Sequence, residues 1–266
     1  MNKDIVILGS KGMLGQMVKK YFTLKGAAVT YCDQRFTYTN RTEYTAYLRS
    51  LRNVVVFNCI GKIKQKTDNI NDFLQSNAIL PAQLRNCLYE DVILIQPSTD
   101  CVFKGDKGDP YIVDDITDVT DDYGWSKCLG EVVLIGRPNT LIPRVSIIGP
   151  DENSEGKGLM TWVMSNRSGK TIKGFTNHLW NGITTLEWCK QVEQFLIQRS
   201  QFDFCLLQYG TTEHYSKYEM LLLFNDVFNL GLHIEPLTTP LSIDRRLAPD
   251  IICKSLESQL AELRSF

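Results

Sequence analysis

A glycine-rich turn near the amino terminus constrains the fold of this chain more than any other feature. Residues 4–8 (DIVIL) form a short apolar run, which is typical of a buried parallel strand, and the turn of residues 9–15 (GSKGMLG) follows directly. Residues 13–24 then carry apolar side chains at helical spacing. A GxxGxxG turn between a strand and a helix predicts a dinucleotide site, because glycines let a pyrophosphate approach the backbone and the helix offers free N–H groups.

Strand-like and helix-like segments alternate through the first half of the chain. We expect further strands at 27–32, 53–60, 92–95 and 140–148, and helices at 42–51, 70–88 and 123–135. This alternation predicts an α/β fold with a Rossmann-like, doubly wound parallel sheet. Pro81 is expected to kink its helix, and Pro143 suggests an edge or irregular position for its strand.

The second half mixes segment types and predicts a smaller lobe. Helices are expected at 159–165, 184–198, 216–228 and 254–263, with strands at 202–207 and 234–237. We expect residues 1–150 to form the dinucleotide-binding core and residues of about 178–210 to return to it. Residues 151–177 and 211–266 are expected to form a small substrate-binding lobe over the carboxyl edge of the sheet, where ligands bind in such folds.

Composition excludes several other classes of function. The 29 Lys and Arg residues nearly balance the 30 Asp and Glu residues, which argues against a nucleic-acid partner. No apolar stretch approaches the length of a signal peptide or a membrane span, so no membrane is expected. The eight cysteines form no CxxC motif and the three histidines are dispersed, so no metal is expected. Free thiols in a reducing, cytoplasmic compartment are the expectation.

The residues after the second strand bear on the choice of cofactor. Asp33 follows the glycines by about twenty residues, and a carboxylate there can accept hydrogen bonds from ribose hydroxyls, which favours NAD. Arg35 could bind a 2′-phosphate, which favours NADP; a solvated loop pair is the alternative. The sequence leaves NAD and NADP open, with a slight preference for NADPH. Within the glycine turn, we expect the cofactor to contact Gly9, Lys11, Gly12, Met13 and Leu14.

A tyrosine and a lysine at helical spacing suggest proton transfer. Tyr123 and Lys127 form YxxxK and share a helix face, so the ammonium can lower the pKa of the phenol. Tyr21 and Lys25 have the same spacing, but they come late in the first helix, where no route to a substrate is expected. The later pair follows the strand that ends in Thr99, and its helix should bring the phenol toward that hydroxyl.

These motifs together resemble the extended short-chain dehydrogenase/reductase family over nearly the whole chain. Gly9, Gly12 and Gly15 match its glycine motif, Thr99 its catalytic hydroxyl, and Tyr123 with Lys127 its YxxxK. The segments STDCVFKG (98–105), YGWSKCLGE (123–131) and NCIG (58–61) are similar to the dTDP-4-dehydrorhamnose reductase branch, whose usual patterns are STDYVF and YGxxKxxGE. Residues 173–190 (KGFTNHLWNGITTLEWCK) resemble bacterial reductases that make nucleotide-linked 6-deoxy sugars and 6-deoxy N-acetylamino sugars.

The resemblance implies an NAD(P)-dependent oxidoreductase. Its expected substrate is a UDP- or dTDP-linked 4-keto-6-deoxyhexose or the 2-acetamido derivative, reduced at the C4 ketone in rhamnose-type or N-acetyl-deoxyamino-sugar biosynthesis. Tyr123 would supply the proton, Lys127 would lower the pKa of that phenol and hold the nicotinamide ribose, and Thr99 would hydrogen-bond the carbonyl or the phenol. The nucleotide sugar is the expected partner, and the sequence allows a homodimer. The alternative is a non-catalytic dinucleotide-binding protein similar to the regulatory subunit of methionine adenosyltransferase.

Cys101 stands where that branch commonly has tyrosine. If the strand stays extended, Cys101 shares a face with Thr99. In related reductases that also epimerise, such as GDP-fucose synthase, a cysteine occupies this place and moves a proton beside the ketone. The resemblance therefore implies a C3 epimerase base, with Lys157 or His178 as its partner, although Cys101 could instead line the substrate or fill core. Lys157 could equally be a surface lysine.

The remaining candidates are weaker, and each has a structural alternative. Cys59 and Gly61 follow the third strand, where the family contacts the cofactor, although a structural turn is the alternative. Arg144 could pair with a phosphate or form a surface ion pair, and Trp180 could stack on a nucleobase or fill core. Asp100 could anchor its loop or be solvated. The expected substrate-binding residues are Asp100, Arg144, His178 and Trp180.

Overall fold

A large parallel sheet forms the core of the computed structural model, which describes residues 3–151, 158–166 and 169–266. Within these residues eight strands pair in the order β15-β11-β6-β4-β3-β1-β2, with β5 also pairing β6, and every pair is parallel. The strands are β1 (Ile5–Leu8), β2 (Val29–Cys32), β3 (Val55–Asn58), β4 (Ile93–Ile95), β5 (Ser98–Thr99), β6 (Thr140–Val145), β11 (Phe204–Gly210) and β15 (Ile251–Ile252).

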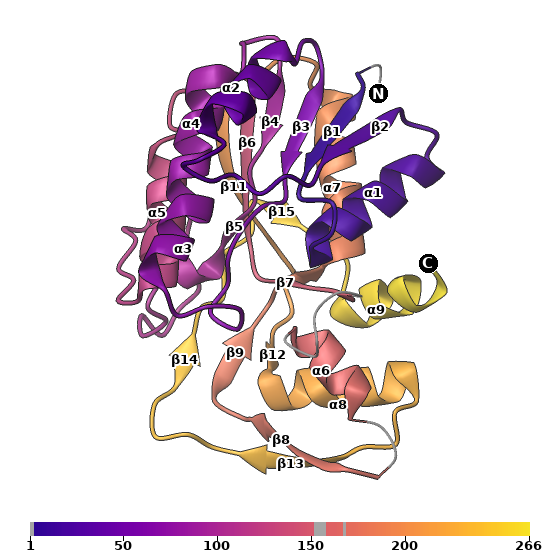
Figure 1. Cartoon of the computed structure of the whole chain (residues 1–266). Helices are drawn as coiled ribbons and strands as arrows, with labels where there is room; N and C mark the ends of the chain where they lie inside the picture. Colours follow the sequence, from indigo (N-terminus) through magenta and orange to yellow (C-terminus); the bar gives the residue numbers. More distant parts are fainter. Residues whose placement is uncertain (1–2, 152–157, 167–168) are drawn as a thin grey trace.

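Helices cover both faces of this sheet. Figure 1 shows α1 (Met13–Leu24) and α7 (Thr185–Gln198) on one side, with α2 (Arg41–Ser50), α3 (Ile70–Leu74), α4 (Leu80–Cys87) and α5 (Asp122–Val132) on the other. Successive strand residues point to opposite faces, so Ile5 and Ile7 pack in the cluster with α1 and α7, while Val6 and Leu8 pack in the cluster with α2 and α4. The prediction of a Rossmann-like, doubly wound α/β fold is confirmed.

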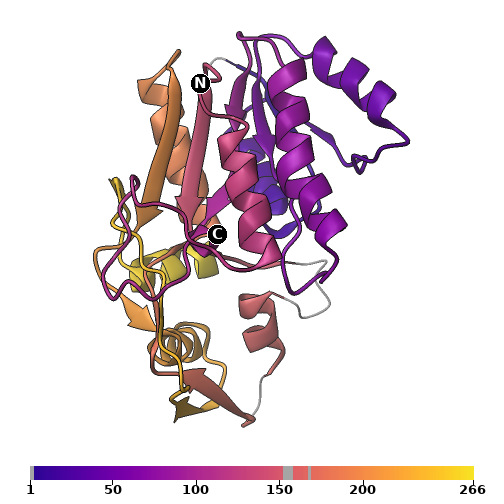
Figure 2. The same cartoon turned by 90° about the vertical axis from the view of Figure 1, so that its left-hand side faces the viewer.

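A smaller set of elements lies beyond the carboxyl ends of the central strands (Figure 2). There β9 (His178–Trp180) pairs with β12 (Tyr215–Ser216) and β14 (Ile243–Asp244), and β8 (Thr171–Phe175) pairs with β13 (His233–Leu237). Helices α6 (Leu159–Ser165) and α8 (Lys217–Phe228) pack with these strands around a separate apolar cluster. The short strands β7 (Ile147–Ile148) and β10 (Ile183–Thr184) pair where the chain passes from the sheet to this region.

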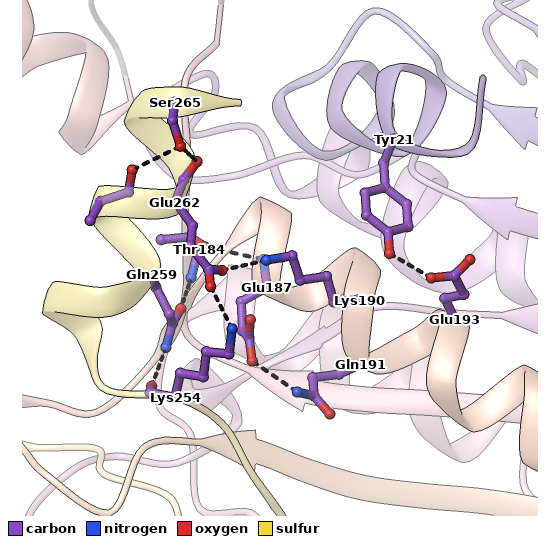
Figure 3. A network of polar contacts seen from close by, with 11 residues as sticks. Tyr21, Thr184, Glu187, Lys190, Gln191, Glu193, Lys254, Gln259, Glu262 and Ser265 are labelled. Carbon is purple, nitrogen blue, oxygen red and sulfur yellow. Dashed lines mark hydrogen bonds and ion pairs between the residues drawn. The ribbon is translucent and has the colours of Figure 1, made fainter. Parts of the chain in front are cut away.

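The carboxyl-terminal segment returns to the large sheet. β15 pairs with β11, and α9 (Leu256–Ser265) docks on α7 through Glu262, which accepts hydrogen bonds from both Lys190 and Lys254 (Figure 3). Gln259 of α9 also accepts from the Thr184 N–H at 2.8 Å. The expected lobe 211–266 thus contains a strand of the large sheet, while β9 of the expected returning segment pairs within the smaller region. The division into domains stays a prediction.

The two prolines singled out in the sequence lie inside regular elements. Residues 70–87 are helical throughout, as expected, and a π-helical turn, η1 (Gln75–Ile79), joins α3 to α4. Pro81 lies in the first turn of α4, and the kink expected there stays a prediction. Pro143 is not at an edge, because β6 lies between β4 and β11. It occupies an irregular position, which was the other expectation, because β4 pairs with residues 140–141 of β6 and β5 with residues 144–145, so Pro143 pairs with neither strand.

Candidate active site

The glycine turn has the geometry that a pyrophosphate requires. Gly9 has φ +82°, a conformation that side chains disfavour. A Cβ on Gly15 would lie 2.1 Å from the Gly9 carbonyl oxygen, so only glycine lets α1 begin this close to the turn. The helix has no side-chain cap at Gly12 and no acidic residue in its first turn, so its first N–H groups remain available to an anion. Lys11 is exposed, and Met13 and Leu14 are partly buried in that turn.

The other expected cofactor residues gather at the same carboxyl ends of β1, β2 and β3. Asp33 accepts hydrogen bonds from both the N–H and the hydroxyl of Ser10, each at 2.8 Å, and so ties the end of β2 to the turn. Arg35 lies 3.5 Å from Asp72 in an ion pair, with 58% of its side chain exposed. The Cys59 N–H donates to the Leu8 carbonyl at 2.9 Å, which places the segment of Cys59 and Gly61 beside the turn.

Asn77 links this segment to the helix of the YxxxK motif. It lies in η1, accepts from the Lys62 N–H at 3.0 Å and donates to the Ser126 hydroxyl at 2.9 Å. A Cβ on Gly130 would lie 2.1 Å from the Asn77 carbonyl oxygen, so α5 packs directly on the π-helical turn. Sequence reasoning missed Asn77, because a π-helical turn leaves no recognisable pattern in one sequence.

Thr99 and Tyr123 come together as expected at the end of β5. The Thr99 hydroxyl donates to Asp100 Oδ1 at 3.0 Å, and it lies close enough to the Tyr123 phenol to influence its pKa. A Cβ on Gly124 would lie 2.4 Å from the Cys101 carbonyl oxygen, so glycine after the tyrosine lets α5 begin against this loop. Asp100 therefore orients the hydroxyl that contacts the phenol.

Burial is the main influence on the protonation of the Tyr123 phenol. Burial raises the pKa of Tyr123 well above its ordinary value, the nearby Cys101 acts in the same direction, and the Thr99 hydroxyl acts against it. Burial lowers the pKa of Lys127 to about 8, and its ammonium donates to the Pro97 carbonyl at 2.6 Å. The expected lowering of the Tyr123 pKa by Lys127 stays a prediction. The phenol keeps its proton and can give it to an acceptor.

Arg144 is a structural residue, contrary to both interpretations of the sequence. Its side chain is 2% exposed and forms a two-pronged ion pair with Glu131, with Nε–Oε1 and Nη2–Oε2 distances of 3.1 and 2.8 Å. Its remaining nitrogen, Nη1, donates to Gln208 at 3.2 Å and to the Val113 carbonyl at 3.3 Å. Because its donors are satisfied by buried partners, Arg144 is neither a phosphate ligand nor part of a surface ion pair.

The two expected substrate residues on β9 have other partners. Trp180 is 3% exposed and its indole N–H donates to the Ser146 hydroxyl at 2.9 Å, so the nucleobase-stacking interpretation was wrong and the core interpretation is confirmed. His178 lies 2.9 Å from the Thr239 hydroxyl through Nε2, and its ring packs on Phe175 with centroids 4.5 Å apart. Burial, with Lys217 nearby, lowers the pKa of His178. Lys157 lies outside the described residues.

Cys101 lies near Thr99 and Tyr123, but its backbone conformation differs from the one expected. The strand ends at Thr99 and a 3₁₀ turn (Asp100–Val102) begins, so the argument from an extended strand was wrong. The thiol nevertheless interacts with Thr99 and with Tyr123. Burial and Asp100 raise the pKa of Cys101 to about 12, against the opposing cations Arg245 and Lys64. No sequence motif pointed to these two cations.

The described residues give no sign of a metal centre or a membrane segment. Among them, no group of three or more His, Cys, Asp or Glu side chains could hold a metal ion. In the same part of the chain, no helix combines the length and the apolar character needed to cross a bilayer.

The doubly wound sheet, the glycine turn and the joined Thr99 and Tyr123 define an extended short-chain dehydrogenase/reductase. Residues 2–172 match the family model described as RmlD substrate binding domain. The chain belongs to this family.

Three comparisons illustrate the relationship. The chain is 32% identical over 157 residues to a dTDP-4-dehydrorhamnose reductase of Mycolicibacterium smegmatis, a match that covers 55% of this chain and 46%, about half, of that protein. A dTDP-4-dehydrorhamnose reductase of Bacillus anthracis in complex with NADP superposes with a TM-score of 0.84 at 17% identity, over 100% of this chain and 99% of that one. Its counterpart from Clostridium acetobutylicum gives 0.81 at 21% identity, over 98% of both chains. The two structural likenesses establish a shared fold.

Proposed function

We propose that this chain is an NAD(P)H-dependent reductase of the C4 ketone of a nucleotide-linked 4-keto-6-deoxyhexose. The observation that carries the proposal is the contact between the Thr99 hydroxyl and the protonated Tyr123 phenol, at the carboxyl edge of the sheet that holds the uncapped glycine turn. The reductases named among its relatives support the same class of substrate. UDP or dTDP as the nucleotide, and hydroxyl or acetamido at C2, are the forms to be tested.

The residues present fit a dinucleotide and a ketone. The glycine turn and the first N–H groups of α1 would hold the pyrophosphate, and bound NAD(P)H would supply the hydride. Thr99 would hydrogen-bond the carbonyl oxygen, and Tyr123 would give that oxygen its proton as negative charge develops there. Lys127, fixed on the Pro97 carbonyl, lies one helical turn from the phenol and would hold the nicotinamide ribose.

NADPH is the cofactor that we favour. Asp33 accepts two hydrogen bonds from Ser10, while the Arg35 side chain is more than half exposed and forms an ion pair with Asp72, so a 2′-phosphate could engage it. Arg35→Gln should then weaken NADPH binding and leave NADH binding unchanged. Equal losses for both cofactors would contradict this assignment.

Turnover on a small panel of substrates tests the reductase. UDP- and dTDP-linked 4-keto-6-deoxyhexoses, each with and without the 2-acetamido group, are mixed with the protein and NAD(P)H, and absorbance at the nicotinamide band is followed. Tyr123→Phe should abolish oxidation. The matched control is Tyr21→Phe, because Tyr21 belongs to the other YxxxK pair and hydrogen-bonds Glu193 at 2.5 Å on α7, away from the site (Figure 3).

Two outcomes would contradict the reductase. The first is no oxidation with any member of the panel. The second is tight NADPH binding that survives Tyr123→Phe while the wild type turns nothing over, which would favour a binding protein.

We further propose that Cys101 takes part in C3 epimerisation. Its thiol interacts with both Thr99 and Tyr123, so a ketone bound to these two residues would bring the adjacent C–H bond near the thiol. Formation of the C3 epimer, lost in Cys101→Ser while reduction survives, is the expected result. Unchanged epimer formation in that variant would remove Cys101 from the role.

The cytoplasmic location and the homodimer stay predictions. For the dimer, four exposed apolar side chains follow one another at helical spacing along α5 and its end: Trp125, Leu129, Val132 and Ile135. Light scattering of the wild type and of Leu129→Glu would test it.

A further inference from the structure

Hydrogen bonds at the end of β14 join the loop that follows Cys101 to the smaller region. The Gly105 carbonyl accepts from the Asp244 N–H, and the Phe103 carbonyl accepts from Arg245 Nε, both at 2.8 Å. Asp244 ends β14, which pairs with β9, and β9 in turn pairs with β12. Because β12 leads directly into α8, the first residue of that helix, Lys217, is brought close enough to the 3₁₀ turn to interact with Asp100 and Cys101.

The Trp180 ring is the contact that the structure gives the Lys217 ammonium. Its side chain is partly buried, and its ammonium lies 5.3 Å from the centroid of the Trp180 ring. Among the residues that the structure describes, it has no hydrogen bond or ion pair, although burying an amine without one is costly. The charged and titratable groups that face it are Asp100, Cys101, Arg245 and His178.

Burial shifts the pKa of the Lys217 amine and the pKa of the Cys101 thiol in opposite directions. It lowers the pKa of Lys217 to about 8, with Asp100 and Cys101 acting against it and Arg245 with it. It raises the pKa of Cys101 to about 12. Near neutral pH part of the Lys217 population is therefore a neutral amine that can accept a proton, while the thiol keeps its own. This reverses the expectation that Cys101 is the base.

His178, the other candidate partner, is held elsewhere. Its Nε2 is engaged by Thr239 and its ring packs on Phe175, and its own pKa is lowered partly by Lys217.

We propose that Lys217 is the base and Cys101 the acid of a proton-transfer pair that acts on the sugar carbon beside the ketone. The pair rests on the proposed keto-sugar function. The C–H bond breaks, its proton bonds to Lys217 Nζ, and its electron pair moves through the carbon–carbon bond to the ketone oxygen as an enolate. The enolate then takes the Cys101 S–H proton at the same carbon and becomes a ketone again, leaving a thiolate. Transfer of a proton from the Lys217 ammonium to that thiolate restores both groups.

Two substitutions of Lys217 distinguish a role as a base from a role as a positive charge. Lys217→Met keeps the apolar stem and removes the amine. Lys217→Arg keeps the positive charge, but a guanidinium stays protonated and cannot act as a base. In D2O, with both C3 epimers of the ketone supplied, we expect either variant to lose solvent exchange at C3 by about 100-fold or more, while NAD(P)H oxidation persists. Wild-type exchange should rise with pH through about 8 and level off above it, because the deprotonated amine is the active form.

The matched control is Lys19→Met. Lys19 also lies over an aromatic ring, 4.1 Å from the Tyr31 centroid, but it is exposed on α1, so its loss should leave exchange unchanged. Competitive acetylation, which needs no substrate, should show Lys217 reacting with a midpoint near pH 8. A melting curve of each variant checks that it is folded.

The results separate the pair from the reductase. Exchange restored by Lys217→Arg would make Lys217 an anion-binding cation and overturn the pair. Reduction without any exchange in the wild type would also overturn it, and the reductase would stand. Exchange without hydride transfer would refute the reductase and support the pair. Absence of both activities would refute both.

Discussion

Glu131 fixes the helix of Tyr123 and Lys127 to the sheet, and removing its charge should cost more than any surface ion pair. Its carboxylate accepts from the Ser98 hydroxyl at 2.5 Å and from two nitrogens of Arg144, and the side chains of the ion pair are 8% and 2% exposed. Glu131→Gln would leave the Arg144 charge buried without its counter-ion. Loss of one partner from a buried pair costs about 3–5 kcal/mol, which is a large share of the stability of an ordinary domain.

Urea unfolding followed by circular dichroism measures this loss. Arg144→Met combined with Glu131→Gln removes both charges, so the double variant should lose about 2 kcal/mol less than the sum of the two single variants. If Glu131→Gln does not fold, Ser98→Ala removes one of the three contacts, keeps the ion pair and should cost about 1 kcal/mol.

The control is Glu262, which accepts from Lys190 and Lys254 between α9 and α7 (Figure 3). Its side chain and that of Lys190 are each 32% exposed, so Glu262→Gln should cost less than about 1 kcal/mol despite two lysine contacts. A cost below about 1 kcal/mol for Glu131→Gln, or additive effects of Glu131→Gln and Arg144→Met, would refute the reasoning from burial.

Three further predictions concern the glycine turn, a buried lysine and a helix cap. Gly15→Ala should abolish NAD(P)H binding by equilibrium dialysis, because its Cβ would lie 2.1 Å from the Gly9 carbonyl oxygen; binding at wild-type affinity would contradict this. Folding lowers the pKa of Lys127 to about 8, so from there to the unfolded value near 10.4 the unfolded chain binds more protons and stability rises with pH. Urea titrations should show this rise in the wild type and not in Lys127→Met; equal slopes would exclude it. Ser216→Ala removes the capping box formed with Glu219 and should lower the free energy of unfolding by about 1 kcal/mol, and an unchanged urea midpoint would show that the cap is dispensable.

The alternation of strands and helices could be predicted because its causes are local. α1 begins and ends where the apolar spacing predicts, and so does α6. Apolar residues with a period of 3.6 require only one buried face, and glycine stops the first strand wherever the sheet lies. Thr99 and Tyr123 were found in the same way, since each lies in a short motif and parallel strands end at one edge of the sheet.

The errors have their causes at long range. Arg144 looked available because nothing near it in sequence is acidic, whereas its partner is Glu131 on the helix before its strand. Pro143 looked like an edge residue, yet β6 exchanges β4 for β5 at this point. Lys217 is more than one hundred positions from Cys101, and only the pairing of β14, β9 and β12 brings the two together. A register of paired strands cannot be read from one sequence.

Both proposed reactions place negative charge on the ketone oxygen, and the electrostatics of the site favour that charge. Reduction places negative charge on the ketone oxygen as an alkoxide, and enolisation places it on the same oxygen as an enolate. Burial keeps the Tyr123 phenol and the Cys101 thiol protonated, so each can donate to a nearby anion. Arg245 and Lys64 act on the same loop as cations and oppose the rise of the Cys101 pKa. A site built around an oxyanion needs only one added base to epimerise before it reduces, and Lys217 is the amine that the structure places there.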